Sequence, residues 1–491
     1  MGIKKYYATA DNTITNARGL NIKTRGTGSN MGASDILEVF SIYGQMTTSS
    51  AELSRALVNF PISSITNDRT QGTIPSSGSV NFYLRLYNAP HGNTTPKNSQ
   101  MSVLAVSRSW NEGTGLDMED YLDLGESNWV KSNSSTDWTS TGGDYHASPS
   151  YTQTLDTGAE NIRVDITSLV EEWIAGTKAN HGVGVKFAPA YEAYLSNSSG
   201  QDSGSILHNT SGATRSYYTK KLFARNTQYF YKKPAIEAQW DSSIKDRRYS
   251  FYSSSSLAPA ADNLNQLYIY NRIRGQLRDI PDIGTGNIYL SLYKTGSDGP
   301  TGSPLSLYHG GTNVTGGHVS TGIYSASIAI DTTENYLYDV WHNDTGTQYT
   351  TGSKFSVFDF DSDVQVGIGD YVSSVTNLKP TYANTEIARL RLFVRDRDWN
   401  PTIYTVATTN IASKVVEDAY WKVYRVQDNE AIIDYGTGSL NHTRMSYDRD
   451  GNYFDVDMSM LEKGYSYALK FVYKINDRYD EQSETFKFRV D

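Results

Sequence analysis

Residues 161–187 read NIRVDITSLVEEWIAGTKANHGVGVKF, and this stretch decides the fold. Branched apolar residues alternate with polar ones over 162–166, as in a strand with one buried face. The period then changes to that of a helical face, with Trp173 as its largest apolar residue and Gly176 as its stop. Alternation returns over 183–187. The stretch therefore predicts a strand, a short helix and a strand, with Trp173 closing one end of a β core.

The helix expected over 167–175 has its own start signals. Thr167 and Ser168 are both residues that cap helices, and Ser168 with Glu171 fits a capping box. We therefore expect these side chains to bind the free backbone N–H groups of the first helical turn.

The same stretch resembles a segment of DNRLRE-type modules, D-(I/V)-T-x-L-V-x-x-W-x-x-G…N-x-G. The matching residues are Asp165, Thr167, Leu169, Val170, Trp173, Gly176, Asn180 and Gly182. A second family element, W-x-E-G-(T/S)-G, is similar to residues 110–115, which read WNEGTG. The closing element is matched loosely by Arg225 and by Lys233–Pro234, with lysine where the family has arginine. This resemblance covers about the first half of the chain. It implies a jelly-roll β-sandwich of extracellular type, and some relatives bind polysaccharide.

The composition is typical of an all-β chain with polar loops. The 37 tyrosines among 491 residues fit strands, where the ring packs and the hydroxyl reaches water. The net charge of −9 argues against a nucleic-acid binder, which needs a basic stripe. The absence of cysteine excludes disulfides and thiolate chemistry.

The chain carries no signal for export or membrane insertion. Residues 1–16 lack the apolar core of a secretory signal, and no run of about 18 apolar residues is present. An extracellular type of module without such a signal fits a virion protein, which is made in the host cytoplasm and exposed later. A protein that is exported by a non-classical route, or cleaved from a precursor, would fit as well. We therefore expect location in a virion and no contact with a membrane.

Alternation divides the chain into three β domains with boundaries near residues 243 and 372. Residues 1–242 are predicted to form a jelly-roll-like sandwich with one short helix. Residues 243–371 and 372–491 are predicted to form two immunoglobulin-like or fibronectin-like β-sandwiches. The polar stretch 117–150 is interpreted as a long ordered loop of the first domain.

A second resemblance lies near the C-terminus. Residues 447–458 (YDRDGNYFDVDM) and 461–467 (LEKGYSY) resemble the S-x-D-x-x-G-N-Y-F-D-L-x-M…L-x-P-x-R-x-Y segment of uncharacterised virion proteins of large tailed phages. Lys463 departs from the proline of that pattern. The resemblance implies a virion structural protein attached to the head, neck or tail. Its expected partners are other virion proteins, and it is expected as a homo-oligomer or in multiple copies.

No motif of known catalytic chemistry occurs in the sequence. A P-loop, a dinucleotide fingerprint, H-E-x-x-H and the G-x-S-x-G nucleophile elbow are all missing. Carboxylates are plentiful, but most acidic β proteins contain many, so they do not define a glycosidase pair. We therefore expect a protein that is not an enzyme.

The alternative function is binding of a host-surface polysaccharide. Aromatic platforms beside polar side chains would be required, and residues of this kind lie in or next to the loop 117–150. The candidates are Trp129, Trp138, Tyr145 and Tyr151. In the competing interpretation the two tryptophans pack back on the sandwich.

Two further sequence patterns are typical of binding sites, one for calcium and one for nucleic acid. Asp448, Asp450 and Asn452 have the spacing of the first half of a calcium loop, but Tyr453 replaces its glycine and the final glutamate is missing. A hairpin turn explains the same residues, and no other cofactor is expected. The segments 217–240 and 271–278 are basic, and we interpret them as closing strands and as a solvated strand edge rather than as nucleic-acid sites.

Overall fold

The structure is a computed structural model of the chain. It describes residues 2–19, 21, 24–43, 51–93, 97–117, 126–192, 195–196, 205–206, 216–359, 370–399, 413–475 and 477–491. At 195–196, 205–206 and 216–217 only the backbone is described. The chain divides into two compact units, Ile3–Trp240 and Asp241–Asp491 with Met1–Gly2. The first unit ends two residues before the boundary expected at 242, whereas the boundary expected near 372 lies inside the second unit.

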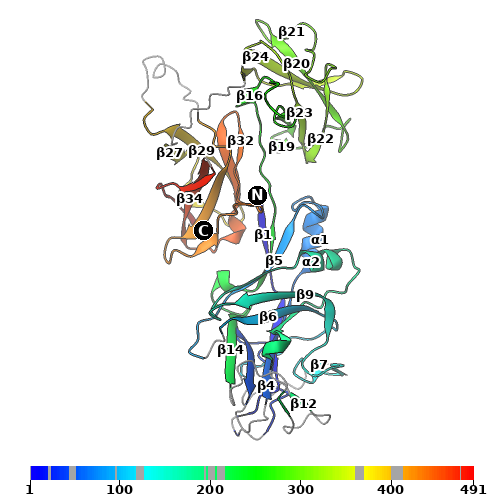
Figure 1. The fold of residues 1–491 in the computed structure, drawn as a ribbon, viewed down its shortest axis with the longest axis vertical. Helices are drawn as coiled ribbons and strands as arrows, with labels where there is room; N and C mark the ends of the chain where they lie inside the picture. Colours follow the sequence, from blue (N-terminus) through cyan, green and yellow to red (C-terminus); the bar gives the residue numbers. More distant parts are fainter. Residues whose placement is uncertain are drawn as a thin grey trace. The chain divides into compact units, whose positions relative to one another are not determined.

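The first unit is built from two antiparallel sheets (Figure 1). Its sheet strands are β1 (Ile3–Tyr7), β2 (Ala10–Thr15), β3 (Ile36–Tyr43), β4 (Ala51–Asn59), β5 (Asn81–Leu86), β6 (Ser99–Val106), β9 (Tyr145–Leu155), β10 (Ile162–Asp165), β11 (Val183–Phe187), β14 (Ser216–Phe223) and β15 (Ala235–Gln239). One sheet has the order β1-β15-β5-β10. The other has the order β14-β3-β4-β11-β6-β9, with β2 paired to β4. Two short hairpins complete the unit: β7 (Lys131–Asn133) with β8 (Thr136–Asp137), and β12 (Leu195–Ser196) with β13 (Ser205–Ile206).

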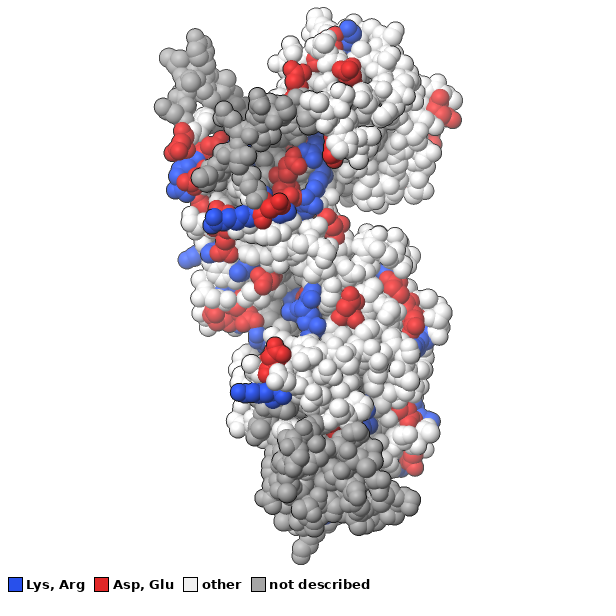
Figure 2. All heavy atoms as spheres, viewed as in Figure 1, with Lys and Arg blue, Asp and Glu red and all other residues white. Residues whose placement is uncertain are grey.

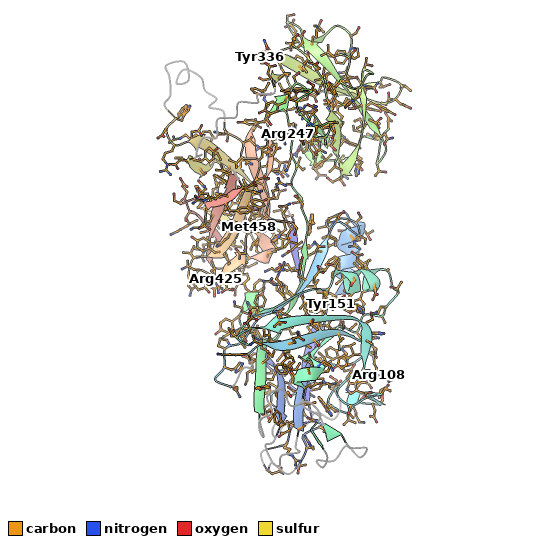
Figure 3. All side chains as sticks on the ribbon, viewed as in Figure 1. Arg108, Tyr151, Arg247, Tyr336, Arg425 and Met458 are labelled. Atoms are coloured by element: carbon orange, nitrogen blue, oxygen red, sulfur yellow. The ribbon has the colours of Figure 1, made fainter. Side chains whose placement is uncertain are left out.

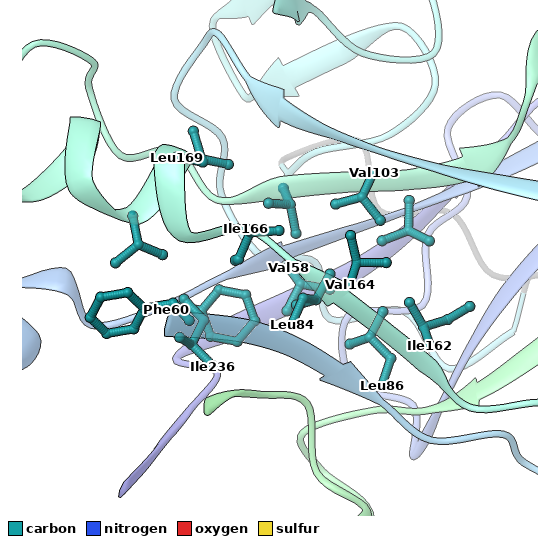
Figure 4. Packing of buried hydrophobic residues seen from close by; sticks show 14 of the residues in the cluster. Val58, Phe60, Leu84, Leu86, Val103, Ile162, Val164, Ile166, Leu169 and Ile236 are labelled. Carbon is teal, nitrogen blue, oxygen red and sulfur yellow. The ribbon is translucent and has the colours of Figure 1, made fainter. Parts of the chain in front are cut away.

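The core of the first unit lies between these two sheets. Val58 and Val103 come from one sheet, Leu84 and Ile162 come from the other, and all four side chains are fully buried (Figure 4). Burying an aliphatic side chain of this size contributes roughly 1.5–3 kcal/mol. The apolar residues that alternate in the sequence are therefore the ones that face the core between the sheets.

The described part of the first unit contains two α-helices, so the expectation of one short helix is corrected. The additional helix, α1 (Ile62–Thr70), reads ISSITNDRT and has little helical patterning. It is held by tertiary contacts instead, because Ile65 is fully buried and Arg69 pairs with Glu171 of the second helix through bonds of 2.6 and 2.7 Å. Packing overrides weak local propensity at this place.

The expected helix, α2 (Thr167–Ile174), is present, and Trp173 is buried as predicted. The expected capping box is wrong, because Ser168 lies inside the first turn and Glu171 is engaged with α1. The N–H of Thr167 is bound by the Asp165 carboxylate at 2.9 Å instead. The free N–H groups of α2 are therefore satisfied from residues before the helix and from a neighbouring strand.

The second unit contains two sets of sheets, and its first set is a curved arrangement of nine strands. These are β16 (Phe251–Tyr252), β17 (Asn265–Tyr270), β20 (Ile288–Thr295), β21 (Pro300–Thr301), β22 (Val314–Ser320), β23 (Ile323–Ile328), β24 (Tyr336–His342), β25 (Gln348–Thr351) and β26 (Phe355–Phe358). The order is β16-β26-β24-β20-β22-β23-β17, with β21 on β20 and β25 on β24. Trp341 is fully buried at its centre. A separate hairpin joins β18 (Arg272–Ile273) to β19 (Gln276–Leu277).

The second set is a sandwich of two sheets. Its strands are β27 (Tyr371–Val375), β28 (Thr381–Tyr382), β29 (Ile387–Asp396), β30 (Ala419–Arg425), β31 (Ala431–Ile433), β32 (Ser446–Asp448), β33 (Gly451–Asp457), β34 (Ser466–Ile475), β35 (Arg478–Glu481) and β36 (Phe486–Val490). The sheets have the orders β27-β29-β33-β32 and β28-β36-β34-β30-β31, with β35 on β34. Trp421 and Phe454 stack between them at 5.2 Å. The chain is thus all-β throughout its described sandwiches, as its sequence predicts.

Residues 244–248, here called the strap, join the two sets of the second unit. The Tyr447 backbone N–H donates to the Ile244 carbonyl oxygen at 2.9 Å, and the Asp246 N–H donates to the Tyr447 carbonyl oxygen at 3.1 Å, which attaches the strap to β32. Three residues after Ile244 along the strap, the Arg247 N–H donates to the Gln266 carbonyl oxygen of β17 at 2.9 Å. The strap therefore carries backbone bonds to both sets within a few residues.

The strap also contains a buried charge cluster. The Arg248 guanidinium binds the carboxylates of Asp246 and Asp339, and it donates to the Tyr268 carbonyl oxygen at 2.7 Å. Asp339 is fully buried and also accepts the indole N–H of Trp341 at 2.7 Å. A buried cation is tolerated in a protein when it is paired in this way.

Candidate functional site

Residues 110–115 belong to the scaffold of the first unit. The Glu112 carboxylate accepts two hydrogen bonds from the Arg225 guanidinium and one, at 2.8 Å, from the Asp11 backbone N–H. Three segments that are distant in the sequence are thereby fixed to one carboxylate. Charge-assisted bonds of this kind are stronger than neutral ones. The motif holds the sandwich together at this point.

Residues 180–182 have a similar role. The Asn180 side chain donates to the Phe60 carbonyl oxygen at 2.9 Å and accepts the Gly182 N–H at 3.0 Å. Gly182 has a φ of 76°, and a Cβ there would lie 2.1 Å from the Val58 carbonyl oxygen. Only glycine fits this conformation and this close approach. These residues therefore shape the turn before β11.

The two tryptophans expected as sugar platforms are buried, which corrects that expectation. Trp129 is 6% exposed and Trp138 is 5% exposed, and both pack in a cluster with Leu57 and Val106. The Trp138 indole N–H also donates to the Asn128 carbonyl oxygen at 2.9 Å. Packing recovers more apolar area than an exposed indole would, so the rings lie against the sandwich and offer no platform.

Tyr151 supports a helix instead of facing a ligand. Its hydroxyl accepts the Leu169 backbone N–H at 3.1 Å and lies 2.7 Å from the Ser168 hydroxyl. It thus satisfies one of the free N–H groups in the first turn of α2. Figure 3 labels Tyr151 and Arg108 at different places on the first unit.

A polar pocket of about 610 Å³ opens beside β6 and β9, and Tyr145 is the one expected platform residue that lines it. Its polar lining residues are Ser107, Arg108, Thr139, Ser140, Asp144, Tyr145, His146 and Lys186. This volume falls within the usual range of small-molecule sites, roughly 300–1,000 Å³. The pocket is the candidate functional site.

Arg108 and Asp144 form the charged pair at the rim of the pocket. The Arg108 guanidinium donates to the Asp144 carboxylate at 2.8 Å, and the backbone N–H groups of Thr139 and Ser140 donate to the same carboxylate at 2.9 Å. Burial opposes ionisation of Asp144, but these donors outweigh it and hold the pKa of the carboxyl below its usual range. Asp144 is therefore a fixed carboxylate.

The Tyr145 ring, which lines the pocket, lies close to two cations. The Tyr145 ring lies 5.9 Å from the Arg55 guanidinium carbon and 5.8 Å from the Lys186 ammonium. Glu192 binds Arg55 at 2.8 and 2.9 Å and Lys186 at 3.5 Å. Burial and the neighbouring Arg55 lower the pKa of Lys186, while Glu192 opposes that change. A Cβ at Gly184 would lie 2.0 Å from the ring, so glycine makes room for it.

This arrangement suits binding better than acid–base catalysis. Asp144 is the one carboxylate among the described lining residues, so the pocket lacks the pair of carboxyl groups that glycoside hydrolysis uses. Two cations, Arg108 and Lys186, stand beside it. The pocket can therefore hold a ligand that offers hydroxyl groups and a negative charge.

Sequence reasoning missed Arg108, Asp144, His146 and Lys186. Arg108 and Asp144 are 36 residues apart in the sequence and meet only because β6 pairs with β9. Lys186 arrives from β11 on the other side of β6. No local signal could have found this combination, since it depends on strand order.

The residues with calcium-loop spacing have other partners in the structure. Both oxygens of Asp448 are bound by the Arg391 guanidinium at 2.9 and 2.8 Å. The fully buried side-chain amide of Asn452 binds the backbone N–H and carbonyl oxygen of Val416, each at 2.8 Å. Asp450 lies in the turn after β32. Within the described ranges, no group of three or more potential metal ligands converges, here or elsewhere.

Comparisons with known proteins show no family for this chain. No family model and no curated protein matches it. Among solved structures, a chain described as tandem Ig repeats of Dlar is 12% identical and matches over 43% of this chain and 91% of its own, with a TM-score of 0.13. The adhesin InvE of Yersinia pseudotuberculosis is 14% identical over 48% of this chain and 61% of its own, with a TM-score of 0.15. The FN1–FN3 domains of chicken CNTN1 are 9% identical over 55% and 80%, with a TM-score of 0.14.

The class that the described sheets define is an all-β chain of sandwiches. None of the described helices is long and apolar enough to span a membrane.

Proposed function

We propose that this chain is a non-enzymatic structural protein of a tailed-phage virion, attached to the head, neck or tail, where it contacts other virion proteins. The observation that carries the proposal is the structural role of the segment that resembles virion proteins. Residues 447–458 contain Tyr447, whose backbone binds Ile244 and Asp246 of the strap, and they supply β33 in the interior of its sheet. A segment that binds the strap and supplies an interior strand has a structural role, as expected in an assembly protein.

Charge pairing supports the same proposal. Arg389 binds both oxygens of Asp455 at 2.8 and 3.0 Å, next to the Arg391–Asp448 pair on the same sheet. Acidic and basic side chains lie interspersed on the face shown in Figure 2. Pairing of this kind fixes side chains in place and leaves few charged groups for proton transfer, which favours an assembly protein.

Mass spectrometry of purified, infectious particles tests this proposal. The chain should be detected among the virion proteins after gradient purification, at a level that does not fall on repeated banding. A non-structural phage protein of similar abundance in the lysate is the control, and it should be removed. Absence of the chain from infectious particles would contradict the proposal.

As a second function, we propose that the pocket beside β6 and β9 binds a host-surface polysaccharide that carries acidic groups. The pocket favours this function because Arg108, Lys186 and the Tyr145 ring converge there with several hydroxyl side chains. The resemblance of the first half to DNRLRE-type modules points the same way. Binding of acidic sugars would use the two cations, which outnumber the single carboxylate.

A glycan array with a matched pair of variants tests the second function. Arg108→Ala removes a pocket cation, whereas Arg163→Ala removes an exposed arginine of β10 that lies over the Tyr83 ring. We expect acidic glycans to bind the native chain and the Arg163 variant, and to lose at least about tenfold in affinity with the Arg108 variant. Equal binding by all three proteins, or no binding to any host-type glycan, would remove this function.

A further inference from the structure

The hairpin of β18 and β19 projects a basic tip from the second unit. Its turn is formed by Arg274 and Gly275, both with positive φ, 52° and 81°, which is the geometry of a tight two-residue hairpin. Residues 272–276 are all exposed. The hairpin forms its own two-stranded sheet, β18-β19, so it is an added element rather than a part of the larger sheet.

Three arginines stand on this hairpin without acidic partners. Within the described residues, no carboxylate lies within ion-pair distance of Arg272, Arg274 or Arg278, and the Arg278 guanidinium donates to the Gln276 side chain at 3.1 Å. The nearest acid in sequence, Asp279, is engaged elsewhere, because its carboxylate accepts the Gly322 N–H at 2.6 Å. It also lies 3.2 Å from the ring nitrogen of His318.

Several other arginines of the same unit are neutralised. Arg389, Arg391 and Arg425 each bind carboxylates at 3.0 Å or less. The hairpin is therefore a local surplus of positive charge in a chain whose net charge is −9. Unpaired guanidinium groups present donors that match carboxylates in a planar, two-bond geometry.

The tip also carries an exposed apolar side chain. Ile273 is 48% exposed and stands between Arg272 and Arg274. Arginine together with a desolvated apolar anchor is typical of protein–protein interfaces, whereas a phosphate polymer would make no use of the isoleucine. The composition of the tip therefore favours a protein partner over a nucleic acid.

We propose that the hairpin β18–β19 docks onto exposed carboxylates of a second copy of this chain. Charge complementarity favours this partner, because each copy carries a net charge of −9, opposite in sign to the three arginines of the hairpin. A hairpin on one copy that binds a different surface of the next copy makes a heterologous contact, which builds rings or open strings. The inference rests on the assembly role proposed above and names the surface that would serve it.

Sedimentation velocity with two charge-reversed variants tests this contact. The double variant Arg272→Glu/Arg274→Glu reverses the charge of the hairpin tip. Arg478→Glu/Lys487→Glu makes the same change in net charge at exposed residues of β35 and β36. At low ionic strength we expect the native chain to self-associate and salt to dissociate it, since exposed charges are screened. The tip variant should lose at least about tenfold in association constant relative to the control variant.

Three results would overturn the contact. These are a native chain that stays monomeric at low ionic strength, an association that the tip variant leaves unchanged, and an equal loss in the control variant. Retention of the full chain on heparin without self-association would assign the hairpin to polyanions instead. A chain that is found in virions but is monomeric in solution would overturn this contact and leave the proposed virion role standing.

Discussion

Asp11 holds its proton to a pH at which most aspartates are ionised. Burial raises the pKa of its carboxyl to about 7, and the nearby Glu112 charge acts in the same direction. One oxygen accepts the Arg225 N–H at 2.6 Å, and the other has no described partner. The folded chain therefore binds a proton between about pH 4 and pH 7 that the unfolded chain has released. The contribution of Asp11 to stability consequently falls as pH rises through that window.

Asp11→Asn tests this linkage. The variant cannot ionise, so it should become more stable relative to the native chain as pH rises from about 5 to about 8. Calorimetry at several pH values gives the Tm difference for the first unit, with the second unit as an internal reference. A Tm difference that does not change with pH would show that Asp11 titrates in its ordinary range.

Trp173 is the residue on which the end of the first sandwich depends. It is 5% exposed and packs in the core of the first unit. Trp173→Ala should cost about 3–5 kcal/mol through loss of packing and formation of a cavity. Trp173→Phe, the matched control, keeps most of the volume and should cost less. Calorimetry of the full chain should show a lower Tm for the first unit and an unchanged Tm for the second, whose core is separate; an unchanged Tm for both would place the ring in solvent.

For single residues, the sequence predicted which side chains are buried better than it predicted which groups they bind. The burial of Trp173 followed from its place on a helical face, because periodicity reports which side of an element is covered. The prediction that Trp129 and Trp138 are exposed was wrong, because a polar loop can fold its large rings back on a sheet. Which side chain binds which, as for Tyr151 and Leu169, depends on tertiary approach and has no local signature.

Among the elements, the strap contains a buried charge cluster whose contribution to the stability of the second unit can be measured. Arg248 is almost entirely enclosed by Asp246, Asp339 and the Tyr268 carbonyl oxygen. Arg248→Met leaves two carboxylates without their cation and should cost about 3–5 kcal/mol in the second unit. Arg247→Met is the control, because its partner Glu417 is half exposed and such pairs contribute about 0–1 kcal/mol.

The loss in the Arg248 variant should be smaller at acidic pH. Burial raises the pKa of Asp246 to about 6 even beside the arginine, so protonation relieves the unpaired charge as pH falls. Urea titrations of both variants near about pH 5 and about pH 8 measure the difference. Equal losses in the Arg247 and Arg248 variants would show that the cluster is hydrated rather than buried.

Elements with strong alternation were found from the sequence, and weakly patterned ones were missed. β11 was predicted with its observed bounds, and β10 within one residue, because one face of each strand is apolar. The helix α1 was missed because Arg69 and the buried Ile65 stabilise it only through neighbours. The first part of the strand β9, up to residue 150, was interpreted as loop because the strand lies at the edge of its sheet and is rich in Ser, Thr and Tyr.

For the whole molecule, the all-β class followed from composition and alternation, whereas the union of the last two sets of strands into one unit did not. That union depends on the strap, on the Tyr270–Tyr453 hydroxyl contact at 3.3 Å and on the Arg247–Glu417 pair, none of which has a local sequence signal. The pocket has the same origin, since it is assembled from three neighbouring strands and a loop.

The central claim, that the chain is a structural part of a virion, is tested most directly by a nonsense mutation in its gene. Phage carrying an amber codon early in the gene would be grown on suppressing and non-suppressing hosts, and the particles from each would be counted by plaque assay and imaged by electron microscopy. The claim predicts that particles from the non-suppressing host lack the chain and are defective, either incomplete in structure or unable to infect. Particles that lack the chain yet form in normal number, with normal structure and full infectivity, would contradict it.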